Sequence, residues 1–306
     1  MSRIACSRLI IVLALSPAAS SSARAQALPT PPRWAPVEAA LGRKGVMQPG
    51  DVLKFSFPRS DLTVTADGVV LKPAFALGSW LAFKDVGAGH SMAMGDLVLT
   101  EDEINPVMRA LQSGGVEQTA LHNHVLGESP HVMYMHIRAH GDAVKIGQTV
   151  RTALASSKTP LGTPGAPAAP SAADLDTAGI ARALGVAGKL NGVVYQVAIP
   201  RRERIRDGRY DVPPSMGMAT AINFQPTGAG KAAISGDFVM RGREVNSVIR
   251  TLQRHDIAVA SIHSHMLDEE PRLYFMHFWA NADAVTLANG LAAALNVTNS
   301  KRDTPK

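Results

Sequence analysis

The stretch Leu121-His-Asn-His-Val-Leu-Gly-Glu-Ser-Pro130 returns in altered form as Ile262-His-Ser-His-Met-Leu-Asp-Glu-Glu-Pro271. The two copies are 141 residues apart, and residues 121–154 and 262–295 share 13 identities in 34 positions without a gap. The same offset aligns Gly95-Asp96 with Gly236-Asp237 further upstream. Self-similarity at a fixed offset indicates one structural unit used twice in the chain.

The spacing of apolar residues predicts the same order of elements in both units. Apolar residues three and four positions apart predict helices around 104–111 and 245–252. The His-x-His strand follows, then a turn with proline and a second strand (132–138 and 273–280). Asp142 and Asp283 are expected to cap closing helices that end near 154 and 295. The predicted fold is α+β, a tandem duplication of one unit with a mainly antiparallel sheet and two helices.

The 306 residues therefore divide into two domains and two accessory segments. Repeat 1 is expected at 30–155 and repeat 2 at 172–300. Residues 156–171, between them, are rich in Pro and Ala, which is typical of an extended linker.

The first 27 residues have the pattern of a cleaved signal peptide. Arg3 and Arg8 precede a short apolar run, Leu9–Leu15, and small residues at 23, 25 and 27 offer cleavage sites. This pattern predicts a periplasmic or secreted protein without stable membrane insertion after cleavage. The only cysteine, Cys6, lies in this segment, so a disulfide scaffold and a cysteine-based zinc finger are excluded.

The charge pattern argues against a nucleic-acid partner. The formal net charge of +6 includes three arginines of the predicted signal. No dense Lys/Arg face remains, and aromatic residues make up only 5% of the chain. The one local cluster of basic residues, at 201–206, is interpreted as solvated surface. The sequence does not identify a protein partner.

The His-x-His pairs point to a metal site. Side chains alternate along a strand, so His122 and His124 share one face. A third histidine, His136, follows on the next strand. Three imidazoles and one carboxylate are a normal ligand set for zinc, copper, iron or manganese. The predicted metal ligands are His122, His124, Glu128 and His136 in repeat 1, and His263, His265, Glu269 and His277 in repeat 2.

This site depends on the register of the hairpin. His136 shares a face with the His-x-His pair only if the residue numbers of paired residues sum to an even number. The competing interpretation is that these are structural histidines of a repeated hairpin. The repeated Asp96 and Asp237 are expected to serve turns, and Glu103 and Glu244 helix entries.

With its His-x-His…Glu-x-Pro…Met-His pattern, the chain resembles the LppY/LpqO-type family of exported bacterial proteins. The residues that carry the resemblance are His122, His124, Pro130, Met135, His136 and Asp142, with their second copies. The resemblance implies export and fold and supplies no activity. The lipid-accepting cysteine of the lipoproteins is missing here, so tethering to a membrane is not implied.

Three functions follow from these observations. The first is an exported soluble protein with a transition-metal site in each repeat, or one site shared between the repeats, and a binding or trafficking role. The second is a non-catalytic envelope interaction module with structural histidines. The third is a metal-dependent hydrolase or oxygenase, which requires an open coordination position and a pocket beside the histidines.

Overall fold

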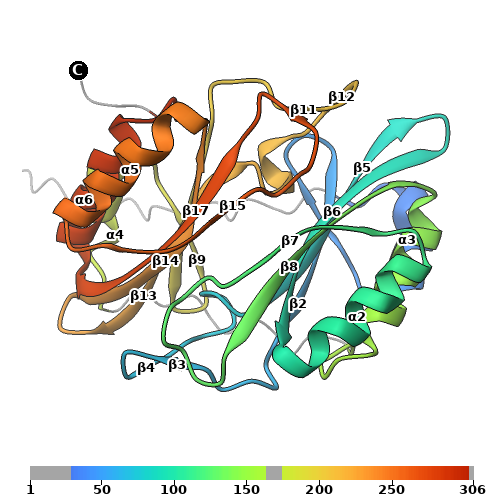
Figure 1. Ribbon diagram of the computed structural model, residues 1–306, viewed down its shortest axis with the longest axis horizontal. Helices are drawn as coiled ribbons and strands as arrows, with labels where there is room; N and C mark the ends of the chain where they lie inside the picture. Colours follow the sequence, from blue (N-terminus) through green and yellow to red (C-terminus); the bar gives the residue numbers. More distant parts are fainter. Residues whose placement is uncertain (1–28, 163–173, 303–306) are drawn as a thin grey trace, which may run out of the picture.

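The computed structural model describes residues 29–162 and 174–302. The predicted signal peptide and most of the predicted linker lie outside these residues, and the predicted domain boundaries stay a prediction. Each repeat builds one six-stranded antiparallel sheet (Figure 1). The first has the order β1 (Val46–Gln48), β2 (Val52–Pro58), β5 (Gly78–Gly87), β6 (His90–Thr100), β8 (Val132–Gly141) and β7 (Glu117–His122). The second has the order β15 (Ala258–His263), β17 (Tyr274–Asp283), β14 (Lys231–Met240), β13 (Ala219–Gly228), β10 (Val194–Pro200) and β9 (Lys189–Asn191).

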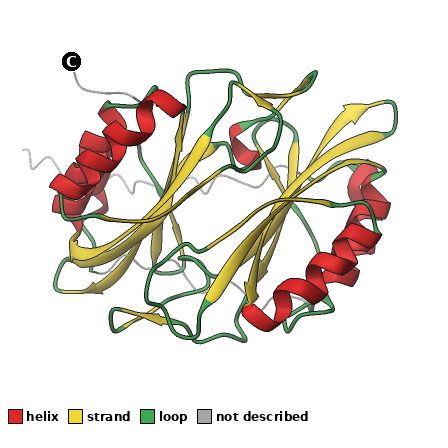
Figure 2. Cartoon of the chain, viewed as in Figure 1, coloured by secondary structure: helices red, strands yellow, loops and turns green. Residues whose placement is uncertain are grey.

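Helices cover the outer face of each sheet (Figure 2). Repeat 1 has α1 (Ala35–Leu41), α2 (Glu101–Ser113) and α3 (Ala143–Leu154), and repeat 2 has α4 (Thr177–Leu184), α5 (Gly242–Arg254) and α6 (Ala284–Asn296). Short 3-10 turns, η1 (Pro32–Trp34) and η2 (Pro214–Met216), complete the helical elements of the described residues. The duplicated α+β fold with antiparallel sheets is thus confirmed, with a short third helix added at the start of each repeat.

Amphipathic patterning explains why the helices pack on the sheets. In repeat 1 the apolar sides of α2 and α3 bury Val107, Leu111 and Val150 against sheet residues such as Phe55 and Phe83. The matching side of repeat 2 buries its own separate core of helix and sheet residues. Each repeat therefore has a hydrophobic core of its own on the helical side of its sheet.

The starts of the closing helices follow the sequence prediction. The Asp142 carboxylate accepts hydrogen bonds from the backbone N–H groups of Val144 and Lys145 at the start of α3. Asp283 accepts one from Thr286 at the start of α6. Each aspartate therefore satisfies backbone donors that have no partner within the helix.

A buried arginine secures the entry of the preceding helix in each repeat. Arg59 is fully buried and donates to both oxygens of Glu103 at 2.7 and 3.1 Å. Arg201 makes the same pair with Glu244 at 2.7 and 3.0 Å. The interpretation of the 201–206 cluster as solvated surface is therefore wrong for Arg201, whose guanidinium is fixed inside the repeat.

The inner faces of the two sheets pack against each other. One interrepeat cluster joins Met92 and Met94 of repeat 1 to Met218 and Phe275 of repeat 2, and a second joins other residues of both repeats. The edge strands β7 and β15 also meet across the repeats. Thr119 donates to the His265 carbonyl at 2.6 Å, so backbone as well as side chains fixes the two sheets in place.

Small hairpins reach from each repeat to the other. The hairpin of β3 (Thr65–Ala66) and β4 (Val69–Val70) places Asp67, which accepts from the Trp279 indole N–H at 2.6 Å. The hairpin of β11 (Arg206–Asp207) and β12 (Tyr210–Asp211), paired through β11 with β16 (Glu269–Glu270), places Asp207 against Arg138 at 2.8 Å. The two contacts are reciprocal, because each repeat holds a hairpin aspartate of the other.

Among the described residues, no helix combines the length and apolar character needed to span a bilayer.

Candidate metal centre

The hairpin register of repeat 1 meets the condition that the sequence left open. Near the histidines, β7 and β8 pair His122 with Tyr134 and Ala120 with His136, so paired residue numbers sum to 256, an even number. β6 pairs Asp96 with His136. His122, His136 and Asp96 therefore point to the inner face of the first sheet.

Repeat 2 has the equivalent register. His263 pairs with Phe275 and Ser261 with His277, and β14 pairs Asp237 with His277. The same set of side chains therefore points to the inner face of the second sheet. Because the two inner faces pack together, the sets of both repeats meet.

The six histidines form a single group, named here the interrepeat histidine cluster. Its rings stack in pairs that join one repeat to the other. Ring centroids are 3.5 Å apart for His122 and His263, 3.7 Å for His124 and His277, and 3.9 Å for His136 and His265. Two aromatic rings close the outer stacks, Tyr134 on His124 and Phe275 on His265.

The donor atoms of this cluster form three groups with metal-binding spacing. Within each group, one donor atom from every residue lies within 4.8 Å of the others. The groups are His122/His124/His277, His122/His136/His263 and Asp237/His263/His265. Two of the three combine residues of both repeats, and the expected trio of His122, His124 and His136 is not among the groups found in the described residues.

Burial keeps these imidazoles neutral. It lowers the pKa of His122 to about 4 and those of His263 and His265 to about 3. Burial and the neighbouring histidines lower the pKa values of His124, His136 and His277 well below the ordinary value. Neutral imidazole is the form that binds a metal ion, so the cluster is ready for coordination near pH 7.

The cluster concentrates buried polar atoms that lack hydrogen-bond partners. Fifteen such side-chain atoms occur among the described residues, and nine belong to the six histidines, Asp96 and Asp237. The Nδ1 atom of His122 lies 3.2 Å from the Asn123 carbonyl oxygen, and its Nε2 atom has no partner. Buried polar atoms without partners are costly, and their concentration at one point indicates that a ligand completes the site.

The two glutamates of the predicted ligand sets lie outside these groups. Glu269 is buried and accepts a hydrogen bond from the Leu273 backbone N–H at 2.8 Å. Glu128 is also buried, and the His131 ring lies 3.6 Å from its carboxylate. Glu128 lies in the loop between β7 and β8 and Glu269 in β16, and the metal-binding role predicted for them stays a prediction.

Two buried aspartates, Asp96 and Asp237, lie close to histidines of the cluster. Asp237 Oδ2 lies 2.9 Å from His265 Nε2, without the alignment of a hydrogen bond, and Asp96 Oδ2 lies 3.6 Å from His124 Nε2. Burial raises the pKa of Asp96 to about 8, with a contribution from Asp237, and burial raises the pKa of Asp237 to about 6. The repeated Gly-Asp pair was the sequence signal for these residues, and the turn role expected for them is wrong, because Asp96 lies within β6 and Asp237 within β14.

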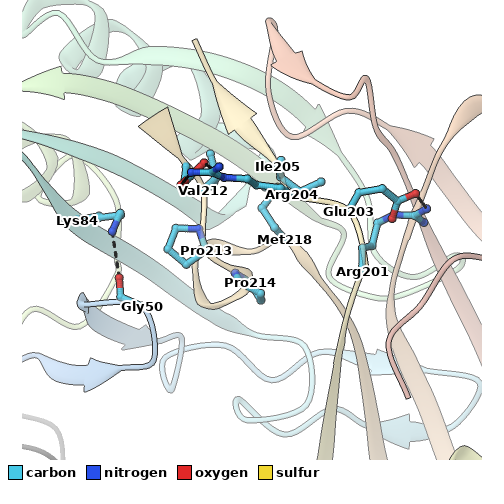
Figure 3. Close-up of a pocket in the computed structure, with 11 residues that line it drawn as sticks. Gly50, Lys84, Arg201, Glu203, Arg204, Ile205, Val212, Pro213, Pro214 and Met218 are labelled. Atoms are coloured by element: carbon cyan, nitrogen blue, oxygen red, sulfur yellow. Dashed lines mark hydrogen bonds and ion pairs between the residues drawn. The ribbon is translucent and has the colours of Figure 1, made fainter. Parts of the chain in front are cut away.

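Two cavities among the described residues have linings that do not include the cluster. One, of about 250 Å³, lies between Gly50 and Lys84 of repeat 1 and residues of 201–218 in repeat 2 (Figure 3). Another, of about 540 Å³, lies beside the β3–β4 hairpin. Neither of these two cavities is lined by a cluster histidine.

Comparison with family models gives a match over most of the chain. A model described as Domain of Unknown Function (DUF1259) matches residues 35–156 and again residues 178–297. The chain belongs to the DUF1259 family. The two matches coincide with the two sheets and their helices, so this DUF1259 chain carries the domain twice and its internal repeat is established. No curated protein matches it.

Some solved structures are similar to this DUF1259 chain, at low scores. The trimeric bacterial microcompartment shell protein PduB has 12% identity and a TM-score of 0.22, over 85% of this chain and 96% of that one. EtuB from Clostridium kluyveri has 9% identity and a TM-score of 0.19, over 82% and 90%. A double-ringed trimeric shell protein of the RMM microcompartment has 11% identity and a TM-score of 0.18, over 68% and 82%.

These comparisons correct the functional expectation. Two of the similar structures are titled as microcompartment shell proteins, a class different from an exported metal-binding or trafficking protein, an envelope module or a metal-dependent enzyme. The expected function and the periplasmic or secreted location have no counterpart in these titles and are not proposed again. Two of the three donor groups combine residues of both repeats and one lies within repeat 2, so the expectation of one separate site per repeat is corrected to a joint cluster. At TM-scores of 0.22 and below, shell assembly is not carried over to this DUF1259 chain, and the resemblance to LppY/LpqO-type proteins stays a prediction.

Proposed function

We propose that the chain is a duplicated scaffold whose halves are fastened together by a buried transition-metal centre in the interrepeat histidine cluster. The role is structural: the ion joins the inner faces of the two sheets. Zinc, copper, iron and manganese all suit a donor set of imidazoles with a carboxylate.

The observation that carries this proposal is the pairing of histidines across the repeats. His122 stacks on its own counterpart His263, and the Nε2 atoms of both are buried without a partner. Six neutral histidines at one interface would leave their nitrogens unpaired when the sheets pack. A metal ion takes lone pairs from several of them at once, and this offsets the cost of removing them from water.

Burial supports a structural role over other uses of a metal. His136, His265 and His277 are 3–5% exposed, and the cluster lies between two hydrophobic interrepeat clusters. An ion held there by residues of both repeats binds the folded chain and not the unfolded one. Its binding free energy is therefore added to the stability of the packed repeats.

Metal content and thermal stability test the proposal together. The full chain is purified without metal-affinity steps, stripped with a chelator and titrated with zinc. We expect bound zinc by elemental analysis and a higher melting temperature, with both effects lost after adding chelator. A chain that stays metal-free after zinc exposure contradicts the proposal.

Matched variants show whether the cluster is responsible. His122→Gln and His263→Gln each remove one imidazole of the central stack and are expected to reduce zinc uptake and the zinc-induced rise in melting temperature. His90→Gln changes an exposed histidine at the start of β6 and serves as the control. Circular dichroism of the stripped variants checks that they fold. Equal zinc uptake by all three variants would exclude the cluster as the binding site.

A further inference from the structure

Two of the three donor groups in the cluster share no residue. One consists of His122, His124 and His277, and the other of Asp237, His263 and His265. The third group takes His122 from the first and His263 from the second and adds His136. The cluster therefore offers either two outer positions or one central position, because a shared imidazole cannot serve both arrangements with one nitrogen.

Each of the two shared histidines, His122 and His263, has only one ring nitrogen available to bind a metal ion. The Nδ1 atoms of His122 and His263 face the carbonyl oxygens of the residues that follow them, at 3.2 and 3.5 Å. Only Nε2 is left on each ring, and both Nε2 atoms are buried without partners. An ion at the central position would therefore take His122 and His263 away from both outer groups.

The number of donors favours the two outer positions. A tetrahedral ion takes about four donor atoms. One central ion would leave His124, His265, His277 and Asp237 buried with donor atoms unpaired, whereas two outer ions use all four. Since each unpaired buried group costs free energy, filling both outer positions satisfies more of the cluster.

We propose that the centre holds two transition-metal ions at inequivalent positions, an inference that rests on the function proposed above. The first position is formed by imidazoles alone and combines both repeats. The second contains the Asp237 carboxylate with His263 and His265. The ring of His136, the counterpart of His277, lies tilted at 3.9 Å from that of His265, and His136 belongs to the central group alone.

The chemistry of the two positions differs. Three imidazoles suit zinc or copper, and two imidazoles with a carboxylate also suit iron or manganese. The two repeats differ in whether their aspartate takes part: Asp237 belongs to a donor group, and its counterpart Asp96 does not. Asp96 has instead Lys54 as a charged neighbour, a residue that repeat 2 replaces by Gln196.

The number of zinc ions bound per chain tests the inference, measured by calorimetric titration and elemental analysis of the stripped full chain. We expect two ions in the unchanged chain, one in His124→Gln and one in Asp237→Asn. Asp96→Asn is the matched control for Asp237→Asn and is expected to keep two ions. Circular dichroism verifies the fold of each variant before titration.

Each of the other possible outcomes overturns a specific part of the inference. One ion in the unchanged chain, retained in His124→Gln and Asp237→Asn, would indicate the central position, so the two-ion inference fails and the proposed metal centre stands. Loss of an ion from Asp96→Asn, with none lost from Asp237→Asn, would overturn the assignment of the second position. No bound zinc in any chain would overturn the proposed function as well.

Discussion

Replacing His265 by glutamine is expected to flatten the acid dependence of stability in the metal-free protein. His265 is 5% exposed, and burial lowers its pKa in the folded chain to about 3. In the unfolded chain its pKa is about 6.5. Below pH 6.5 the unfolded state therefore binds a proton that the folded state does not, and folding stability falls as the pH is lowered towards 3.

The size of the effect follows from these two pKa values. One pH unit of difference in proton binding corresponds to about 1.4 kcal/mol. Between pH 6.5 and pH 5, His265 remains neutral in the folded chain and becomes charged in the unfolded chain. The contribution lost over this range is about 2 kcal/mol, and it is restored when the pH rises again.

Urea unfolding at pH 5, 6 and 7, in the presence of a chelator, measures this contribution. The comparison uses the change in unfolding free energy with pH, since His265→Gln also changes stability at every pH. We expect the unchanged chain to lose about 2 kcal/mol more than the variant between pH 7 and pH 5. Identical pH dependences would refute the claim that His265 is buried and neutral in the fold.

Three further predictions concern other parts of the molecule. Glu103→Gln removes one of the two carboxylates that pair with the buried Arg59, leaving Asp61 at 2.8 Å, and is expected to destabilise the fold by about 1.5–3 kcal/mol in urea unfolding; a loss under 1 kcal/mol would contradict the buried pair. Asp142→Ala removes the cap of α3 and is expected to cost about 1 kcal/mol, as is Asp283→Ala at α6; a neutral result for both would argue against capping. Zinc affinity at the Asp237 position is expected to fall about tenfold from pH 7 to pH 5, because protons compete for a carboxylate with a pKa of about 6; the one ion that Asp237→Asn retains should lack this dependence, and the same tenfold fall for that ion would assign the dependence to another group.

The internal repeat made most of the fold predictable. The offset of 141 residues located both sheets, and the helical spacing located α2 and α5 to within a few residues. The capping roles of Asp142 and Asp283 followed from local chemistry alone, because a cap involves only neighbouring backbone. The short first helices, α1 and α4, carry too few turns to give a clear periodic pattern.

The hairpin register is the feature that the sequence alone did not predict. Alternation along a strand predicted that His122 and His124 share a face. The pairing of His122 with Tyr134 in the structure puts His136 on that same face. Parity of the register at the histidines depends on the turn between β7 and β8, which the sequence did not reveal, whereas the bulge near Thr119 changes the pairing only beyond Ala120. A conditional prediction was therefore the most that the pattern supported.

The joining of the two histidine sets could not be read from either repeat. The pattern within a repeat describes one sheet, whereas the stacking of His122 on His263 depends on how two sheets pack. The ligand role predicted for Glu128 and Glu269 stays a prediction: both are buried, Glu269 accepts from the Leu273 backbone N–H, and neither belongs to a donor group. Asp237 reaches the histidines because its strand, β14, pairs with the strand that carries His277.

The most direct test of the account is an anomalous-difference map, recorded at the zinc edge, from crystals of the zinc-loaded chain. The account predicts strong density between the repeats, within coordination distance of Nε2 atoms from both His-x-His pairs. Density confined to exposed side chains, or no density in the interrepeat histidine cluster of a chain that has been exposed to zinc, would contradict a metal centre that fastens the two repeats together.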